Sequence, residues 1–405
     1  MPDRNRLTAM VHFEIDPETT RLLEMVRWLG REYMRPLGIE ADRKHQPIPA
    51  DHPFYKQVWD LGIGRRGWGE EQGSSEGPHR AARRGVVLAE EMAYWDRGVA
   101  VSLPGPGLGA PPILLLGTPE QKQRFFSVFN DPERPHWGAF AMTEPGAGSD
   151  VAAIRTRARR EGDYWVLTGE KMFCSNGARA DWVVVWATID PALGREGHRA
   201  FVVERGTPGF RVERIEDKMG LVAYESAALV FEDCRVPAAN LLGGEEAYRE
   251  RAGFKGAMQS FNATRPMVAA MAIGIARAAL DRATEFVRTA YRQMAPTARY
   301  RRILDKLLWM ERKIACGRWL CWRAAYLADM QQPNITEASM AKAYCPQIAQ
   351  EATSLAMEVL SDLGATKDAL VEKWFRDVKA MDIVEGTGQI QRRIIARQLT
   401  GLAEV

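Results

Sequence analysis

The hydrophobic pattern of the chain changes twice, and the order of the three patterns constrains the fold more than any other feature. Up to about residue 138, apolar residues recur at helical spacing, as in residues 22–29 and 86–94. Short β-type runs follow, and the helical pattern returns from about residue 250. We therefore predict a multidomain α+β protein with an N-terminal helical domain (1–138), a middle β-barrel or sandwich domain (139–248) and a C-terminal four-helix-bundle domain (249–405).

Composition excludes several classes of protein. A net charge of +3 over 405 residues is too small to indicate a nucleic-acid or membrane-surface protein. The five cysteines form no CxxC pair and the six histidines do not cluster with them, which argues against a metal site or a disulfide framework. No apolar run approaches the ~20 residues of a spanning helix, and no signal peptide is evident. We therefore expect a cytoplasmic protein without bound metal.

One carboxylate lies in a setting that favours acid–base chemistry. Glu385 follows the apolar pair Ile383 and Val384 and precedes Gly386-Thr387-Gly388, after which a helical pattern begins. A carboxylate in a poorly solvated position has a raised pKa, as a general base requires. The glycines leave room for a flat ligand near the backbone. On spacing alone, a loop glutamate that merely caps the last helix is the favoured interpretation.

Two further segments carry small polar residues in irregular positions. Residues 140–150 read FAMTEPGAGSD, and their glycines and hydroxyls suit a phosphate or the edge of a flavin. Residues 172–177 read MFCSNG, in which an aromatic is followed by a hydroxyl residue. Such a pair can contact a flavin ring and hydrogen-bond its N5 atom. A glycine-rich loop alone is a weak signal, and a plain β-turn is the alternative.

These three segments together resemble the acyl-CoA dehydrogenase family. The resemblance extends over nearly the whole chain and includes GLGAPPILLLGTPEQKQRFF at 107–126, LVFEDCRVPAANLLG at 229–243 and AGFKGAMQSFNATRPMVAA at 252–270. It implies FAD as cofactor, with Thr143 at the pyrimidine side of the ring, Phe173 beside the ring and Ser175 at N5. The full set of implied cofactor-binding residues is Phe140, Met142, Thr143, Gly148, Ser149, Phe173, Ser175, Thr387, Gly388 and Gln389.

The resemblance also implies which residues meet the substrate and which one is the base. Members of the family carry the catalytic carboxylate either at the position of Glu385 or near Thr264, and residues 262–265 contain no carboxylate. Glu385 is therefore the expected base. The residues implied to bind the acyl-CoA are Ser149, Asn262, Thr264, Arg265 and Gly386.

By the same resemblance, the expected reaction is FAD-dependent α,β-dehydrogenation of an acyl-CoA to a trans-2-enoyl-CoA. Glu385 would remove the α-proton, and a hydride would pass from the β-carbon to flavin N5. The thioester carbonyl would lie between the N–H of Glu385 and a ribityl hydroxyl. An electron-transferring flavoprotein is the expected electron acceptor. An oxygen-using flavin oxidase or monooxygenase on the same fold, or an assembly subunit of a hetero-oligomeric dehydrogenase, is the alternative.

The chain departs from the family where a neighbouring subunit normally contacts FAD. The family's Arg-x-x-Phe-Gly segment is missing, and its Gln-x-x-Gly-Gly-x-Gly segment contains Glu358 and Asp362. Two anionic groups near a pyrophosphate are electrostatically unfavourable. Two assemblies are open. One is a hetero-oligomer whose related partner supplies the missing groups, and the other is a homodimer or homotetramer that uses Arg299, Arg301 or Arg302 instead.

Overall fold

The computed structural model describes residues 14–65, 81–249, 252–294 and 297–402. For residues 249, 252–263 and 294 it describes the backbone alone. Contacts between residues group the chain into two compact units. The first, here called the helical unit, comprises residues 1–36, 76–97 and 262–405, and the second, the sheet unit, comprises residues 37–75 and 98–261.

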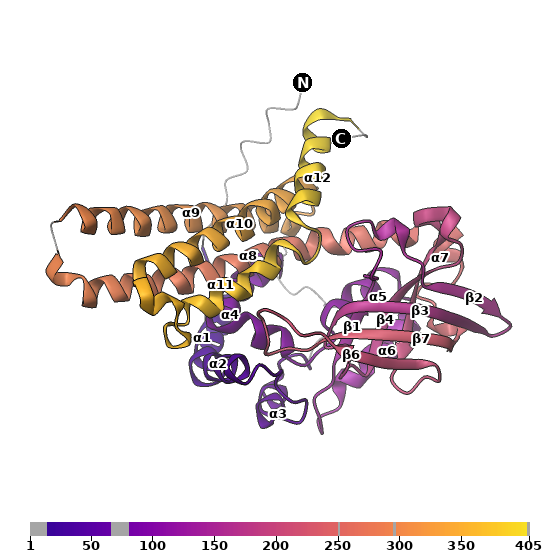
Figure 1. Cartoon of the computed structure of the whole chain (residues 1–405). Coiled ribbons are helices and arrows are strands. Elements are labelled where there is room, and N and C mark those ends of the chain that lie inside the picture. Colours follow the sequence, from indigo (N-terminus) through magenta and orange to yellow (C-terminus); the bar gives the residue numbers. More distant parts are fainter. Residues whose placement is uncertain (1–13, 66–80, 250–251, 295–296, 403–405) are drawn as a thin grey trace. The chain divides into compact units, whose positions relative to one another are not determined.

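The helical unit joins the first helices of the chain to the last ones (Figure 1). Its elements are α1 (Pro17–Leu29), a π-helical turn (Gly30–Met34), most of α4 (Ala81–Ser102), most of α8 (Ala252–Ala290), α9 (Ala298–Asp329), α10 (Ile335–Leu360), α11 (Val371–Lys379) and α12 (Gly388–Thr400). The short helix α2 (Arg35–Lys44) crosses the boundary between the units. The predicted C-terminal helical part is confirmed.

Small residues let these helices approach closely. A Cβ added at Gly274 of α8 would lie 2.1 Å from the carbonyl oxygen of Glu90 on α4. One added at Gly317 of α9 would lie 2.5 Å from Ile273 on α8. Helix axes come this near only where one partner lacks a side chain. The proline and the Ala-rich stretch after it predict a long helix that begins at Pro266, which is wrong: α8 begins at Ala252 and contains Pro266.

The sheet unit is built on one seven-stranded sheet. Its strands are β1 (Gly138–Ala141), β2 (Arg157–Glu161), β3 (Tyr164–Ser175), β4 (Trp182–Thr188), β5 (His198–Glu204), β6 (Phe210–Ile215) and β7 (Ser226–Pro237). The order is β1-β4-β2-β3-β7-β6, with β5 paired to β4. The short helices α3 (Pro53–Asp60), α5 (Ala110–Leu116), α6 (Pro119–Ser127) and α7 (Glu246–Arg249) belong to the same unit.

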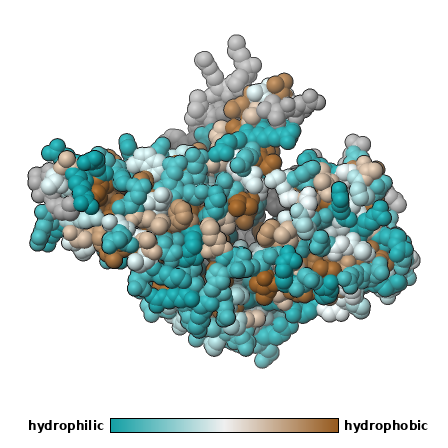
Figure 2. Space-filling view, in the orientation of Figure 1, coloured by the Kyte–Doolittle hydropathy of each residue, from teal (hydrophilic) through white to brown (hydrophobic). Residues whose placement is uncertain are grey.

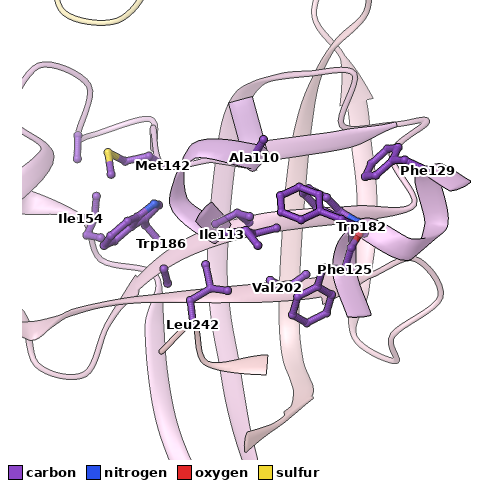
Figure 3. Packing of buried hydrophobic residues seen from close by; sticks show 14 of the residues in the cluster. Ala110, Ile113, Phe125, Phe129, Met142, Ile154, Trp182, Trp186, Val202 and Leu242 are labelled. Carbon is purple, nitrogen blue, oxygen red and sulfur yellow. The ribbon is translucent and has the colours of Figure 1, made fainter. Parts of the chain in front are cut away.

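The core of the sheet unit forms around β4, whose seven residues are all buried. Trp182 and Trp186 on this strand pack against Ile113 of α5 and Phe125 of α6 in one hydrophobic cluster (Figure 3). The unbroken run of apolar and aromatic residues at 182–189 predicts a strand buried on both faces, and the burial of β4 agrees with it. The helical–β–helical order of the fold is thus confirmed, while the domain boundaries at 138 and 248 stay predictions.

Polar residues predominate on one face of the molecule. Hydrophilic residues occupy most of the face shown in Figure 2, with hydrophobic residues exposed mainly in small groups. Within the described ranges, no helix combines the length and the apolar character that crossing a membrane requires.

Candidate functional site

The turn that carries Glu385 joins two helices of the helical unit. A 3-10 turn (Ala380–Asp382) follows α11, and α12 begins at Gly388. Thr387 is the N-cap of α12, where its hydroxyl accepts a hydrogen bond from the N–H of Ile390. The turn is therefore fixed on one side by a capped helix, whose cap is Thr387 and not Glu385.

Glu385 itself has an unusual backbone conformation for a glutamate. Its φ is +55° and that of Gly386 is +92°, so two consecutive residues are left-handed. A residue with a Cβ rarely adopts this conformation, which is enriched at functional positions. One carboxylate oxygen of Glu385 accepts a 2.6 Å hydrogen bond from the hydroxyl of Thr264 on α8. The backbone N–H of Glu385 makes no hydrogen bond within the described ranges and is available as a donor.

Burial and nearby cations act on the Glu385 carboxylate in opposite directions. Burial raises its pKa above the ordinary value, because a carboxylate loses hydration. The Thr264 hydrogen bond and the positive charges of Lys342, Arg97 and Arg265 lower it in part. The net result is a raised pKa, which is the property expected of a general base.

The structure brings several predicted residues of the helical unit to this turn and leaves others apart. Thr264 contacts the carboxylate directly, and Arg265, only 6% exposed, acts on it through its charge. Gly388 is buried at the first position of α12, whereas Gln389 is exposed. The side chain of Asn262 lies outside the described part of the chain.

In the sheet unit, a buried ion pair holds the glycine-rich loop. Lys171 on β3 donates to Glu144 at 2.7 Å and to the carbonyl oxygen of Met142 at 2.9 Å. The Glu144 carboxylate also accepts from the N–H groups of Arg155 and Thr156, at 2.6 and 2.9 Å. Although burial acts to raise the pKa of Glu144, Lys171 and these hydrogen bonds keep it below the ordinary value. The loop is therefore anchored by a charged group at its centre.

The second flavin segment lies beside this loop. The N–H of Met172 donates a 2.9 Å hydrogen bond to the carbonyl oxygen of Thr143, which joins residues 140–150 to the end of β3. Phe173 lies at a break in the β3–β7 register, with φ of +57° and a side chain that is 57% exposed. Ser175 is the last residue of β3 and is half-buried.

The other predicted loop residues differ in what they can offer a ligand. The side chain of Met142 is buried in the hydrophobic cluster of Figure 3, so only its backbone can face a ligand. Phe140 packs partly against the same cluster. Gly148 and Ser149 are exposed, and a Cβ added at Gly148 would meet nothing within 4 Å.

These residues fit the FAD that the family resemblance implies. An exposed aromatic side chain at Phe173 can contact an isoalloxazine ring. The hydroxyls of Thr143 and Ser175 donate no hydrogen bond within the described ranges. Backbone N–H groups beside Gly148 can approach a phosphate closely. The described residues contain no group of three or more potential metal ligands.

Inspection of the sequence missed two polar residues at the Glu385 turn. Lys342 on α10 and Gln391 on α12 are both fully buried, and each donates to the carbonyl oxygen of Gly386. The available signal for Lys342 was its position: it falls on an apolar stripe with Ala338, Ala341 and Cys345 at helical spacing. A lysine on such a stripe is expected to have a specific partner.

Of the two anionic residues expected to disfavour a pyrophosphate, Glu358 has a cationic partner in the structure. The carboxylate of Glu358 forms an ion pair with Lys306 across α9 and α10. Its negative charge is therefore partly compensated within the chain. Asp362 is exposed in the turn that follows α10.

Comparison with known proteins gives matches over almost all of the chain. Models of the acyl-CoA dehydrogenase N-terminal, middle and C-terminal domains match residues 16–130, 139–234 and 251–400. Acryloyl-CoA reductase (NADH) of Anaerotignum propionicum is 36% identical over 391 residues, which cover 95% of this chain and 96% of the relative. Mitochondrial short-chain specific acyl-CoA dehydrogenase of Bos taurus is 36% identical over 386 residues, covering 95% and 90%. The structure of butyryl-CoA dehydrogenase from Megasphaera elsdenii superposes with a TM-score of 0.85 at 32% identity, covering 96% and 99%.

Proposed function

Because this chain belongs to the acyl-CoA dehydrogenase family, we propose that it oxidises a short-chain acyl-CoA to the trans-2-enoyl-CoA with Glu385 as the base. Family membership makes it a FAD-dependent flavoprotein and an oxidoreductase acting on CH–CH bonds. The short-chain preference is proposed from the names of its relatives. The observation that carries the role of Glu385 is its desolvated carboxylate in a left-handed turn.

In this proposal, Glu385 and its neighbours remove a proton, bind the thioester carbonyl and orient the carboxylate. The carboxylate removes the α-proton of the acyl thioester and keeps it. The free N–H of Glu385 donates to the thioester carbonyl oxygen, where negative charge develops during proton removal. FAD, when bound, supplies the acceptor, at N5, for the hydride that leaves the β-carbon. Thr264 orients the carboxylate through its 2.6 Å hydrogen bond.

The remaining predicted residues are proposed to bind cofactor and substrate. Those proposed to contact FAD are Phe140, Met142 through its backbone, Thr143, Gly148, Ser149, Phe173, Ser175, Thr387, Gly388 and Gln389. Those proposed to contact the acyl-CoA are Ser149, Asn262, Thr264, Arg265 and Gly386. An electron-transferring flavoprotein is the proposed acceptor of the electrons.

Anaerobic titration of the purified flavoprotein with acyl-CoA thioesters tests the function. Butyryl-CoA and propionyl-CoA should bleach the flavin absorbance and yield the corresponding 2-enoyl-CoA. Free CoA, which has no α-proton, is the control and should leave the absorbance unchanged. If every acyl-CoA of a chain-length series left the flavin oxidised, the proposal would be wrong. Peroxide formed in stoichiometric amounts under air would identify an oxidase instead.

Reduction of a 2-enoyl-CoA is a second candidate, favoured by the 36% identity to acryloyl-CoA reductase (NADH) over nearly the whole of both chains. The two directions use the same residues. Measuring product formation from butyryl-CoA with an electron acceptor, and from crotonyl-CoA with NADH and the necessary electron carrier, distinguishes them.

Two assemblies are proposed, a homo-oligomer and a hetero-oligomer with a related subunit. The Lys306–Glu358 ion pair weakens the charge argument for the hetero-oligomer, because it compensates one of the two anionic groups. Expression of the chain alone decides between them. One FAD per subunit with full activity would establish the homo-oligomer. A colourless protein that binds flavin only when it is co-expressed with a related subunit would establish the hetero-oligomer.

A further inference from the structure

Three lysines of the described chain have buried side chains, and one of them differs from the other two. Lys171 and Lys373 each bind a carboxylate, at 2.7 and 2.8 Å. Lys342, with 0% of its surface exposed, forms no ion pair within the described ranges. Its hydrogen bond goes to the carbonyl oxygen of Gly386, at 3.2 Å. Burying an ammonium group without a carboxylate in contact is costly, so this lysine is not explained by ion-pair stability.

A second buried donor reaches the same carbonyl from another helix. The side-chain amide of Gln391 on α12 donates to the carbonyl oxygen of Gly386 at 3.0 Å and to that of Glu385 at 3.4 Å. Gln391 has no exposed surface. Its own side-chain oxygen accepts no hydrogen bond within the described ranges, so the amide is oriented by these two donations. Helices α10 and α12 therefore converge on one carbonyl group.

That carbonyl belongs to the turn that orients Glu385. The left-handed conformation of Glu385 is strained, and such a conformation persists only when its surroundings hold it. Gly386, also left-handed, has no Cβ, and one added there would lie 2.7 Å from the amide nitrogen of Gln391. The glycine thus makes room for the donor that holds the turn. If both donors were lost, the turn could relax and move the carboxylate.

We propose that Lys342 and Gln391 are positioning residues for Glu385, which together hold the carbonyl group of Gly386 and so fix the direction of the Glu385 carboxylate. The inference rests on the proposed role of Glu385 as the base. The two residues differ in one respect, because Lys342 carries a charge near the carboxylate and Gln391 does not. Their substitution should therefore have separable effects.

The charge of Lys342 acts within a defined set of groups. Those around Lys342 and Glu385 are Arg97 on α4, Arg265 on α8, Cys345 on α10 and Asp382 in the preceding turn. Burial lowers the pKa of Lys342 to about 8, with Asp382 and Glu385 opposing the shift. At neutral pH the ammonium is thus mainly charged and stabilises the ionised carboxylate. Removing this charge raises the pKa of Glu385 further.

Four variants separate position from charge. Gln391→Met removes a donor without changing charge, and Lys342→Met removes both a donor and a charge. Lys342→Arg keeps the charge and a donor. Lys379→Met is the control, because it removes an exposed positive charge from α11 of the same unit. The rate constant of flavin reduction is measured as a function of pH by anaerobic stopped flow with butyryl-CoA.

The expected results differ for each variant. Gln391→Met should lower the high-pH plateau about 10- to 100-fold and leave the pH midpoint unchanged. Lys342→Met should lower the plateau and also move the midpoint upward by about one pH unit. Lys342→Arg should keep the wild-type midpoint, and Lys379→Met should match the wild type in both. Plateaus within twofold of the wild type in folded Gln391→Met and Lys342→Met would overturn the proposal.

A measurement without substrate separates this inference from the proposed function. Infrared titration of protein labelled with ¹³C-glutamate, with the Glu385→Gln spectrum subtracted, gives the protonation of Glu385 directly. The midpoint should be higher in Lys342→Met than in the wild type and unchanged in Lys379→Met. Equal midpoints in Lys342→Met and the wild type would overturn the role of the charge. Failure of the wild type to react with any acyl-CoA would instead count against the proposed function. Should Lys342→Met not fold, Gln391→Met and Lys342→Arg still decide the positioning role.

Discussion

The hydroxyl of Thr264 lies 2.6 Å from a carboxylate oxygen of Glu385, although the two residues are 121 positions apart in the chain. This bond stabilises the ionised form of a carboxylate that burial otherwise drives toward the protonated form. The family resemblance pointed to Thr264 as the neighbourhood of an alternative base position. In this chain the position carries a hydrogen-bond donor to Glu385, the proposed base.

Thr264→Val should move the pH dependence of the reaction upward. The substitution removes the hydroxyl at nearly constant volume, so the pKa of Glu385 should rise because the hydrogen bond that lowers it is lost. A base works only when deprotonated, so the midpoint of the rising limb shifts to higher pH. The pH profile of flavin reduction measures the shift. Thr353→Val, which removes a buried hydroxyl bonded to α10 backbone, is the control and should leave the midpoint in place.

Glu385→Gln should stabilise the protein at neutral pH. The pKa of Glu385 in the folded protein lies above its ordinary value of 4.5. The folded state then binds a proton more tightly than the unfolded one, so stability falls as pH rises through the folded pKa. Each unit of difference corresponds to about 1.4 kcal/mol.

The melting temperature as a function of pH measures this effect. Glu385→Gln should melt above the wild type at about pH 7, and the gap should close as the pH falls below the ordinary value for glutamate. A wild type that melts above the variant at neutral pH would show that the surrounding cations outweigh the cost of burial.

Gly386→Ala should lose both stability and activity. A Cβ there would lie 2.7 Å from the amide of Gln391, and φ is +92°. The left-handed backbone alone costs about 1–2 kcal/mol, and displacement of the turn should slow flavin reduction about 10- to 100-fold. Gly206→Ala is the matched control, since Gly206 has φ of +82° and open space around its Cβ position.

Denaturant unfolding measures the stability of the two glycine variants, and stopped flow measures their rates of flavin reduction. Gly206→Ala should lose a similar free energy of unfolding, because its backbone is also left-handed, but it should reduce the flavin at the wild-type rate. Equal rates in Gly386→Ala and the wild type would mean that the turn tolerates displacement and that its geometry is not essential.

Lys171→Met should release the loop of residues 140–150. The variant leaves Glu144 buried without its ion-pair partner, which costs about 3–5 kcal/mol. Lys56→Met, which breaks an exposed pair with Asp60, should cost at most about 1 kcal/mol. Urea unfolding measures both, and fluorescence titration measures FAD affinity. We expect weaker FAD binding in Lys171→Met only, and unchanged affinity there would separate the loop from the cofactor.

Local sequence patterns were sufficient for the buried strand β4 and the helical–β–helical order, because long apolar runs are strong signals. They were insufficient for β1 (Gly138–Ala141) and β2 (Arg157–Glu161). The sequence of β2 is RARRE, which has one apolar residue, and its strand conformation comes from pairing with β3. Such long-range pairing leaves little trace in a local pattern.

The candidate site likewise contains some residues that the sequence indicated and others that it did not. Glu385 stood out because a carboxylate between apolar residues and glycines is conspicuous, and its contact with Thr264 lies where the resemblance placed substrate-binding residues. Lys342 and Gln391 lie on helices whose local patterns say nothing about which turn they reach. Arg97 acts on Glu385 from α4, next to Asp96, where the helix departs from helical geometry. Contacts that depend on how helices pack cannot be read from spacing alone.

The most direct test of the account is the reaction of Glu385→Gln with butyryl-CoA in anaerobic stopped flow. The variant should purify with its yellow flavin, and reduction should be slower than in the wild type by about 10²- to 10⁴-fold. Glu351→Gln, on the exposed side of α10, should react like the wild type. Bleaching of Glu385→Gln at the wild-type rate would contradict the assignment of Glu385 as the base.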